Sequence, residues 1–204
     1  LASTVASTAS LCSPKHKTQL SPSRTRVLFR VPSRAPSLNP LFTPALTDMD
    51  KVLSKHGDCK VVVATHAHVA MIYPHMRMAD KVEVACMGHE PCQSLIGALE
   101  DDDVTLTALD GDDVPFAMFG VGQVGEQAYI WCLGTDSVSD NAYQFLKASR
   151  EWTQRLTKPY GATFNFVHED NHVALKWLKF CGAIFIRKLT FSNQPFFEFI
   201  IPSK

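Results

Sequence analysis

Histidines and cysteines, the side chains best suited to metal chemistry, crowd one stretch of this 204-residue chain between positions 66 and 92. Such side chains bind zinc when they occur in pairs at ligand spacing, as in C-x-x-C followed by a second pair. No C-x-x-C pair occurs, and His66 and His68 would share a face only on a strand. We therefore expect no metal site, and we expect the histidines to lie on polar helix faces or to cap helices. The residues concerned are His66, His68, His75, Cys86, His89 and Cys92.

Carboxylates gather in two short runs, at residues 101–103 and 110–113. A calcium loop of the EF-hand type needs regular acidic spacing and a Glu at its twelfth position, and neither run provides them. We therefore expect both runs to be solvated turns. The glycines at positions 120, 122 and 125 fall in an expected hairpin rather than in a strand-to-helix turn, so they do not predict a phosphate loop.

The elements that must position these residues alternate along the rest of the chain. A β-branched strand comes first, then a helical pattern that Pro74 should break or kink, then a weakly alternating stretch at 81–88. A second helix, three strands joined by hairpin loops, a long helix, a strand, a short helix and a last hairpin follow. The expected ranges are strands 59–65, 104–110, 114–121, 128–135, 161–168, 183–191 and 195–201, and helices 66–80, 91–100, 139–156 and 170–180.

This order predicts an α+β fold: a mixed sheet in which an antiparallel meander passes into a β-α-β-α-β unit, with helices on both faces. The crossover from the strand at 128–135 through the long helix to the strand at 161–168 should be parallel and right-handed.

The first 48 residues differ in composition from the rest. They hold half of the twelve prolines, many Ser and Thr, six Lys or Arg and one acidic residue. Such a stretch cannot bury enough apolar surface to fold, so we expect a disordered leader. Three interpretations stay open: an organelle transit peptide, a plain disordered arm, or an artefact upstream of a true start at Met49. The folded domain is expected at 49–204.

The charge and cysteine content limit the function of the body. Residues 49–204 carry 14 basic and 19 acidic residues, a net charge of −5, which disfavours binding of nucleic acid by the folded body. No stretch approaches 18 uncharged apolar residues, so no membrane span is expected. The six cysteines are scattered, which indicates a reducing compartment without a disulfide framework.

A short helix bounded by Asn and Gly carries the first resemblance to a known family. In "EDNHVALKWLKFCGAIF" (169–185), Asp170 or Asn171 can cap the helix start, and Gly182 can supply a left-handed cap at its end. Asn171, Ala174, the pair Trp177-Leu178 and Gly182 resemble the late motif of the GNAT superfamily of acetyl-CoA-dependent N-acetyltransferases. The resemblance implies a GNAT-like fold.

A more specific resemblance lies in four stretches taken together: "ATHAHV…MRMADKVEV" (64–84), "IWCLGTDS" (130–137), "FLKASREW" (145–152) and "NHVALKWLKFCGA" (171–183). The set resembles a family of internal virion proteins of short-tailed phages, which are themselves GNAT-like. It covers about residues 60–201 and implies a role in virion assembly or in the capsid interior. It implies other virion or assembly proteins as partners, and a location in the host cytoplasm or the virion. Organelle import remains the alternative if the leader is a transit peptide.

Acetyl-CoA chemistry in the GNAT superfamily implies a glycine-bearing donor loop at a helix start and often a Tyr seven residues after the Asn. The corresponding loop, "GTDSVSDNAY" (134–143), has only Gly134, and Asp136 and Asp140 would repel a pyrophosphate. Leu178 stands at the Tyr position. We therefore expect no cofactor and a non-enzymatic virion-assembly role, with an acetyl-CoA-dependent N-acetyltransferase as the alternative. If acetyl-CoA binds, the resemblance implies contacts at Leu133, Gly134, Thr135 and Asn171.

Overall fold

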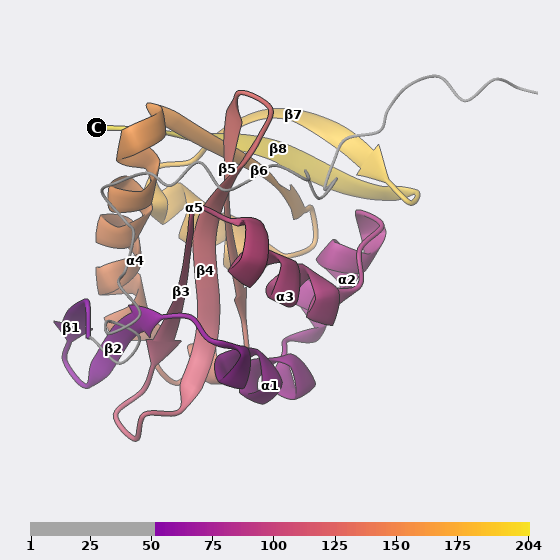
Figure 1. Ribbon diagram of the computed structural model, residues 1–204. Helices are drawn as coiled ribbons and strands as arrows, with labels where there is room; N and C mark the ends of the chain where they lie inside the picture. The colour runs from indigo at the N-terminus through magenta and orange to yellow at the C-terminus, as the bar shows by residue number, and fades with distance from the viewer. Residues whose placement is uncertain (1–51) are drawn as a thin grey trace, which may run out of the picture.

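An eight-stranded mixed sheet runs through residues 52–204, the part of the chain that the computed structural model describes (Figure 1). The strands follow the order β1-β2-β3-β4-β5-β6-β8-β7. The predicted disordered leader, residues 1–48, lies outside the described residues. The strands are β1 (Ser54–His56), β2 (Cys59–Val63), β3 (Val104–Leu109), β4 (Pro115–Val124), β5 (Gln127–Gly134), β6 (Ala162–His168), β7 (Ile184–Phe191) and β8 (Gln194–Pro202).

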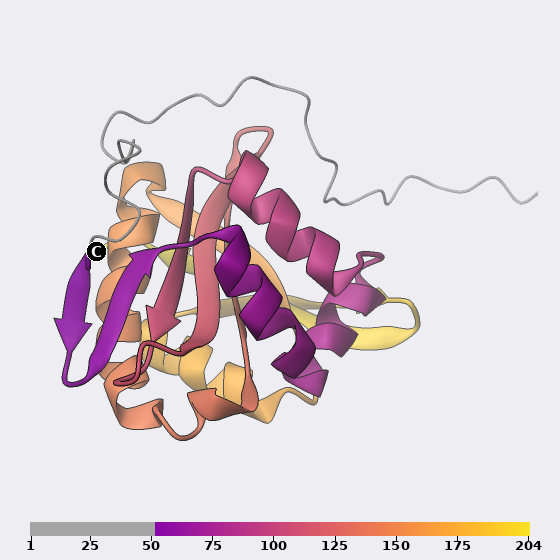
Figure 2. The same ribbon diagram turned by 60° about the horizontal axis from the view of Figure 1, so that its bottom comes forward.

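Helices cover both faces of this sheet, as predicted. Figure 2 shows α1 and α3 in front of the strands and α4 behind them. The amphipathic α4 packs Trp152 and Leu156, each 2% exposed, into the larger core beside Phe116 of β4. None of the helices in residues 52–204 combines the length and the apolar character needed to cross a bilayer. The helices are α1 (His66–His75), α2 (Met78–Cys86), α3 (Pro91–Asp101), α4 (Ala142–Thr157) and α5 (His172–Cys181), with short 3₁₀ turns η1 (Asp136–Val138) and η2 (Lys158–Tyr160).

The predicted meander and crossover are both present. Strands β2 to β5 pair antiparallel in chain order, and β5 and β6 pair parallel across α4. Strand β6 then pairs antiparallel with β8, and β8 pairs antiparallel with β7. The later strand of the last hairpin, β8, therefore lies inside the sheet, and the earlier strand, β7, forms its edge. The result is one sheet whose parallel junction lies between β5 and β6.

The region after Pro74 differs from the sequence-based expectation. The first helix ends at His75, one residue after Pro74, and residues 78–86 form the separate helix α2. The alternation of Lys81, Val82, Glu83 and Val84 imitates a strand, but burial follows a helical period. Asp80 and Val84 are buried, whereas Val82 is 41% exposed. The weak alternation at 81–88 was therefore a misleading signal.

The Asn-to-Gly helix forms as its sequence predicts. Asn171 Oδ1 accepts a hydrogen bond from the Ala174 N–H at 3.2 Å, so Asn171 is the N-cap of α5. Gly182 has a φ of 95° at the C-terminal end, and Leu178 and Cys181 are buried. This turn directs the chain into β7.

We expect Gly182→Ala to lower the free energy of unfolding by about 1–2 kcal/mol, because L-residues are strained in the left-handed region. The cost is purely conformational, since a Cβ there would meet nothing nearer than Lys204 at 3.8 Å. Gly97→Ala, in mid-helix with nothing within 4 Å of the added Cβ, is the matched control and should be neutral or stabilising. Urea unfolding measures both, and equal effects would contradict the expectation.

Candidate functional site

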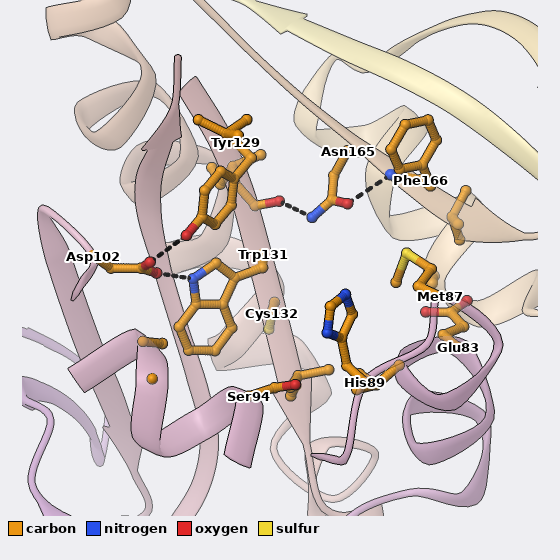
Figure 3. A pocket seen from close by; sticks show the side chains of 18 of the residues that line it. Glu83, Met87, His89, Ser94, Asp102, Tyr129, Trp131, Cys132, Asn165 and Phe166 are labelled. Atoms are coloured by element: carbon orange, nitrogen blue, oxygen red, sulfur yellow. Dashed lines mark hydrogen bonds between the residues drawn. The ribbon is translucent and has the colours of Figure 1, made fainter. Parts of the chain in front are cut away.

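A cleft opens where the two parallel strands diverge. Within residues 52–204, β5 and β6 share a single register pair, Tyr129 with Phe164. Immediately beyond it the buried Asn165 bridges the strands, because its Nδ2 donates to the Ile130 carbonyl at 2.8 Å (Figure 3). The cleft has a volume of about 290 Å³ and is lined by β5, β6, α2, α3 and α5. Divergence of the strands therefore leaves a concave site of the kind that holds small ligands.

One wall of the cleft is fixed by Asp102, at the C-terminal end of α3. Its carboxylate accepts hydrogen bonds from the Tyr129 hydroxyl and from Trp131 Nε1, the latter at 2.6 Å (Figure 3). Burial raises the pKa of Asp102 to about 6, although both hydrogen bonds oppose the rise. The expectation of a solvated turn at 101–103 is wrong for this residue, because two aromatic donors on β5 draw it inward.

Two carboxylates of α2 bridge the far ends of the diverging strands. Asp80 accepts the N–H of Gly134, the last residue of β5, at 2.8 Å. Glu83 accepts the N–H of His168, the last residue of β6, at 2.9 Å. Since the two acids are three residues apart, they lie on one face of the helix. We call this arrangement the α2 bridge: one helix satisfies a backbone donor at the end of each parallel strand.

The Glu83 carboxylate is the second acid of the cleft lining with a raised pKa. Its Oε1 also accepts Asn171 Nδ2 at 2.9 Å, whereas its Oε2 accepts no hydrogen bond from residues 52–204. Burial is the main cause that raises its pKa to about 7, and nearby Asp80 adds to the rise. A carboxyl poised near neutral pH in a cleft is a candidate for proton transfer or for binding a cation.

The four positions named for an acetyl-CoA contact lie close together. Leu133 lines the cleft. The N–H of Gly134 is engaged by Asp80, and Thr135 donates both its N–H and its hydroxyl to the Phe116 carbonyl. Asn171 caps α5 and donates to Glu83. Three of the four are thus engaged in hydrogen bonds within the protein.

Gly134 has a packing explanation. A Cβ at this position would lie 2.6 Å from a methyl group of Val138 and 3.3 Å from the Phe116 carbonyl oxygen. A side chain here would have to displace Val138, so the close approach of η1 accounts for the glycine.

The loop between β5 and α4 also uses its own donors. The 3₁₀ turn η1 makes Val138, Ser139, Asp140 and Asn141 donate their N–H groups to carbonyls of residues 135–137. Asp136 and Asp140, both exposed, add negative charge at the same helix start. Within this loop, most donors that a helix N-terminus offers to an anion are already satisfied.

The described histidine and cysteine residues do not assemble into a metal site. Among residues 52–204, no group of three or more His, Cys, Asp or Glu side chains is placed to hold a metal ion. His68 forms a capping box with Thr65 at the start of α1, a role that the sequence analysis expected for these histidines. Cys132 lines the cleft, but burial raises the pKa of its thiol to about 12, so it is not a thiolate at neutral pH.

Sequence reasoning missed Glu83 and Asp102, the two acids that shape the cleft. The partners of Glu83 lie 85 and 88 residues away along the chain, and those of Asp102 lie 27 and 29 residues away. The one local signal was a charged residue between two valines, "VEV" at 82–84, which is unusual for a solvated helix face.

No family model and no curated protein sequence matches the chain. Solved structures do match it. The ribosomal-protein-S5-alanine acetyltransferase of Vibrio fischeri gives a TM-score of 0.55 at 10% identity, over 74% of this chain and 96% of that one. A GNAT-family acetyltransferase of Bacillus anthracis gives 0.56 at 8% identity, over 72% and 96%. A spermidine N-acetyltransferase of Vibrio cholerae, in complex with CoA and spermine, gives 0.52 at 8% identity, over 72% and 96%.

Identities this low carry the fold and not the activity. The match covers 96% of each of these three structures. The described residues form the mixed sheet with helices on both faces that was predicted from the sequence. The chain therefore has the fold of the GNAT N-acetyltransferases.

Proposed function

We propose that this chain is a GNAT-fold protein without acetyltransfer activity, which acts by binding other proteins in the assembly or interior of a phage-type virion. The virion role rests on the sequence resemblance over about residues 60–201. The absence of acetyltransfer rests on one observation: the backbone donors at the ends of β5 and β6 are engaged by the protein itself, Gly134 by Asp80 and His168 by Glu83.

Acetyl-CoA is the cofactor that the fold implies, and the residues present do not fit its diphosphate. An anion at a helix start needs free N–H groups and is favoured by positive charge. Here the 3₁₀ turn satisfies most N–H groups of the loop, and Asp136 and Asp140 stand beside them. Within residues 52–204, the side chains that line the cleft include neither Lys nor Arg. This combination supports a binding role over CoA-dependent catalysis.

We expect acetyl-CoA to bind the full chain with a dissociation constant far weaker than micromolar. Loss of about 3–4 kcal/mol of phosphate binding takes a micromolar affinity into the millimolar range. Calorimetric titration measures it, with the Asp136→Asn/Asp140→Asn double variant as the matched comparison. That variant should bind slightly better, because two repulsive charges are gone. Low-micromolar binding by the unmodified chain would contradict the proposal.

The assembly half of the proposal is tested on particles. If the chain acts in a virion, it should co-sediment with purified particles at a fixed stoichiometry and resist a salt wash. Recovery only in the particle-free supernatant would contradict that role. The partners in this proposal are virion or assembly proteins. Nucleic acid is disfavoured as a partner by the net charge of −5 on residues 49–204.

An N-acetyltransferase is the second candidate, and Glu83 is the observation that favours it. An amine must lose a proton before it attacks an acyl group, and a carboxylate with a pKa near 7 can accept that proton at neutral pH. Glu83 lines the cleft and has one oxygen without a hydrogen bond from residues 52–204. Tight binding of acetyl-CoA in the titration above would favour this candidate over the first.

A further inference from the structure

We propose that the outer face of α4 and α5 binds a second copy of this chain, in a twofold dimer in which the facing helices run antiparallel. The inference goes beyond the function proposed above, because none of the exposed residues that form this face lines the cleft. Three features support it: the alignment of the two helices, their exposed apolar side chains, and the division of charge along them.

Helices α4 and α5 lie side by side and run in the same direction. The rings of Phe145 and Trp177 stack, with their centroids 6.2 Å apart. One turn later on each helix, Cys181 Sγ lies 3.9 Å from Ser149 Oγ. Since the second contact lies further along both helices by the same number of residues, the helices are parallel and their N-terminal ends lie together.

Large apolar side chains are exposed on the outer side of this helix pair. Val173 and Phe180 are exposed and lie on the same flank of α5 as Trp177, the residue that contacts α4. Arg150, one turn after the exposed Leu146 of α4, places its guanidinium 5.9 Å from the centroid of the Phe180 ring. The exposed apolar residues of both helices therefore belong to one surface, which we call the α4–α5 face. Its apolar members are Tyr143, Leu146, Val173 and Phe180.

The charges of the α4–α5 face are divided between its two ends. Asp140 and Asp170 are exposed just before α4 and α5, at the shared N-terminal end. Arg150 and Lys179 are exposed about 14 Å further along the two helices, at 1.5 Å per residue. The face thus has an acidic end and a basic end, with the apolar side chains between them.

These charges are available to a partner. Within residues 52–204, Asp140, Asp170 and Arg150 form no ion pair with an opposite charge. Glu151, the one acid of α4, pairs with Arg155, and α5 contains no acid. An apolar patch rimmed by unpaired charges is typical of a protein–protein interface.

A second copy of the chain matches this pattern of charge. A twofold axis that crosses the helices at right angles places the acidic end of one face on the basic end of the other, and apolar side chains on apolar side chains. Counted from the two contacts that align the helices, Asp140 then lies opposite Arg150 of the second copy, and Val173 lies opposite Phe180 of the second copy.

Other occupants match the face less well. Nucleic acid and an anionic membrane carry one sign of charge, and the acidic end would repel both. The leader at residues 1–48, with six basic residues and one acidic residue, lacks the carboxylates that the basic end requires. The pattern therefore favours a partner with both signs of charge at opposite ends, as an identical face has.

Sedimentation velocity of the full chain across the micromolar range tests the proposal. We expect a monomer–dimer equilibrium. Val173→Glu, at a position that is 63% exposed, should weaken the dimer by about tenfold or more, because the twofold axis buries the introduced charge twice. Met78→Glu, at a position on α2 that is 72% exposed, is the matched control and should leave the equilibrium unchanged. Urea unfolding checks that both variants are folded.

Charge reversal tests how the two copies are oriented. Arg150→Glu should weaken the dimer, because the new carboxylate would face Asp140 of the second copy. The double variant Arg150→Glu/Asp140→Arg should restore it, since each facing pair again has opposite charges. Failure of the double variant to restore the dimer would overturn the antiparallel arrangement.

A chain that stays monomeric across the concentration range would overturn the inference. A dimer that keeps full affinity in Val173→Glu, or one that Met78→Glu weakens equally, would do the same. Vesicles of phosphatidylserine and phosphatidylcholine test the membrane as occupant. Binding of the monomer to these vesicles, if Val173→Glu abolished it, would assign the face to a membrane surface and overturn the dimer.

Discussion

Replacement of Asp80 by alanine is expected to lower the free energy of unfolding by about 3–5 kcal/mol, because it breaks a buried ion pair and removes one partner. Asp80 is 1% exposed, accepts two hydrogen bonds from the Arg77 guanidinium, and accepts the Gly134 N–H. Without the carboxylate, Arg77 is left partly buried without its counter-ion, and a backbone donor loses its acceptor. Chemical denaturation measures the loss.

Asp80→Asn is the matched comparison for this prediction. The amide oxygen can still accept the Gly134 N–H, but the charge that balances Arg77 is gone, so its loss should be intermediate. If Asp80→Ala cost less than about 1 kcal/mol, water or a rearranged Arg77 would have replaced the carboxylate. The α2 bridge would then contribute little to holding β5.

Replacement of Glu83 by glutamine is expected to remove the part of the pH dependence of stability that this acid causes. Burial raises the pKa of Glu83 from 4.5 to about 7, so the folded protein holds this proton more tightly than the unfolded chain. Its contribution to stability is complete below pH 4.5 and is lost as the pH rises through 7. At 1.36 kcal/mol per pKa unit, the difference amounts to about 3 kcal/mol.

Glutamine has no proton to lose and keeps an oxygen for the His168 N–H and Asn171. Relative to the unmodified chain, Glu83→Gln should therefore gain about 3 kcal/mol of stability between about pH 5 and pH 8. Urea unfolding at several pH values measures the two curves, with Glu126→Gln as the control that should follow the unmodified chain. Parallel curves for Glu83→Gln would show that the acid is better solvated than its burial indicates.

Asp80 and Glu83 give α2 a hydrogen-bonding role in addition to its packing. Strands that diverge leave unpaired backbone groups, and such groups need an acceptor when water is excluded. The α2 bridge supplies one for the end of each strand, at Gly134 and at His168. The same helix also lines the cleft through Glu83.

Much of the architecture could be predicted from the sequence, because it follows from local patterns. The hairpins of the meander and the amphipathic period of α4 each reside in a few consecutive residues. So do the Asn171 and Gly182 caps of α5, and the order of these elements implied the parallel junction. Strand β1 (Ser54–His56) and helix α2 are the exceptions. The sequence analysis expected no strand before residue 59, and the alternation of Val82 and Val84 with charged residues resembles a strand when its burial is unknown.

The site itself was decided only by the tertiary structure. No local pattern tells that β5 and β6 pair once and then separate, because strand divergence depends on what packs between the strands. No local pattern pairs Glu83 with His168, or Asp102 with Trp131. The perturbed pKa values of the two acids arise from burial, which long-range packing sets. The fold, and the absence of phosphate-loop glycines at 134–143, could therefore be predicted from the sequence. The acidic cleft could not, because it depends on contacts between residues far apart in the chain.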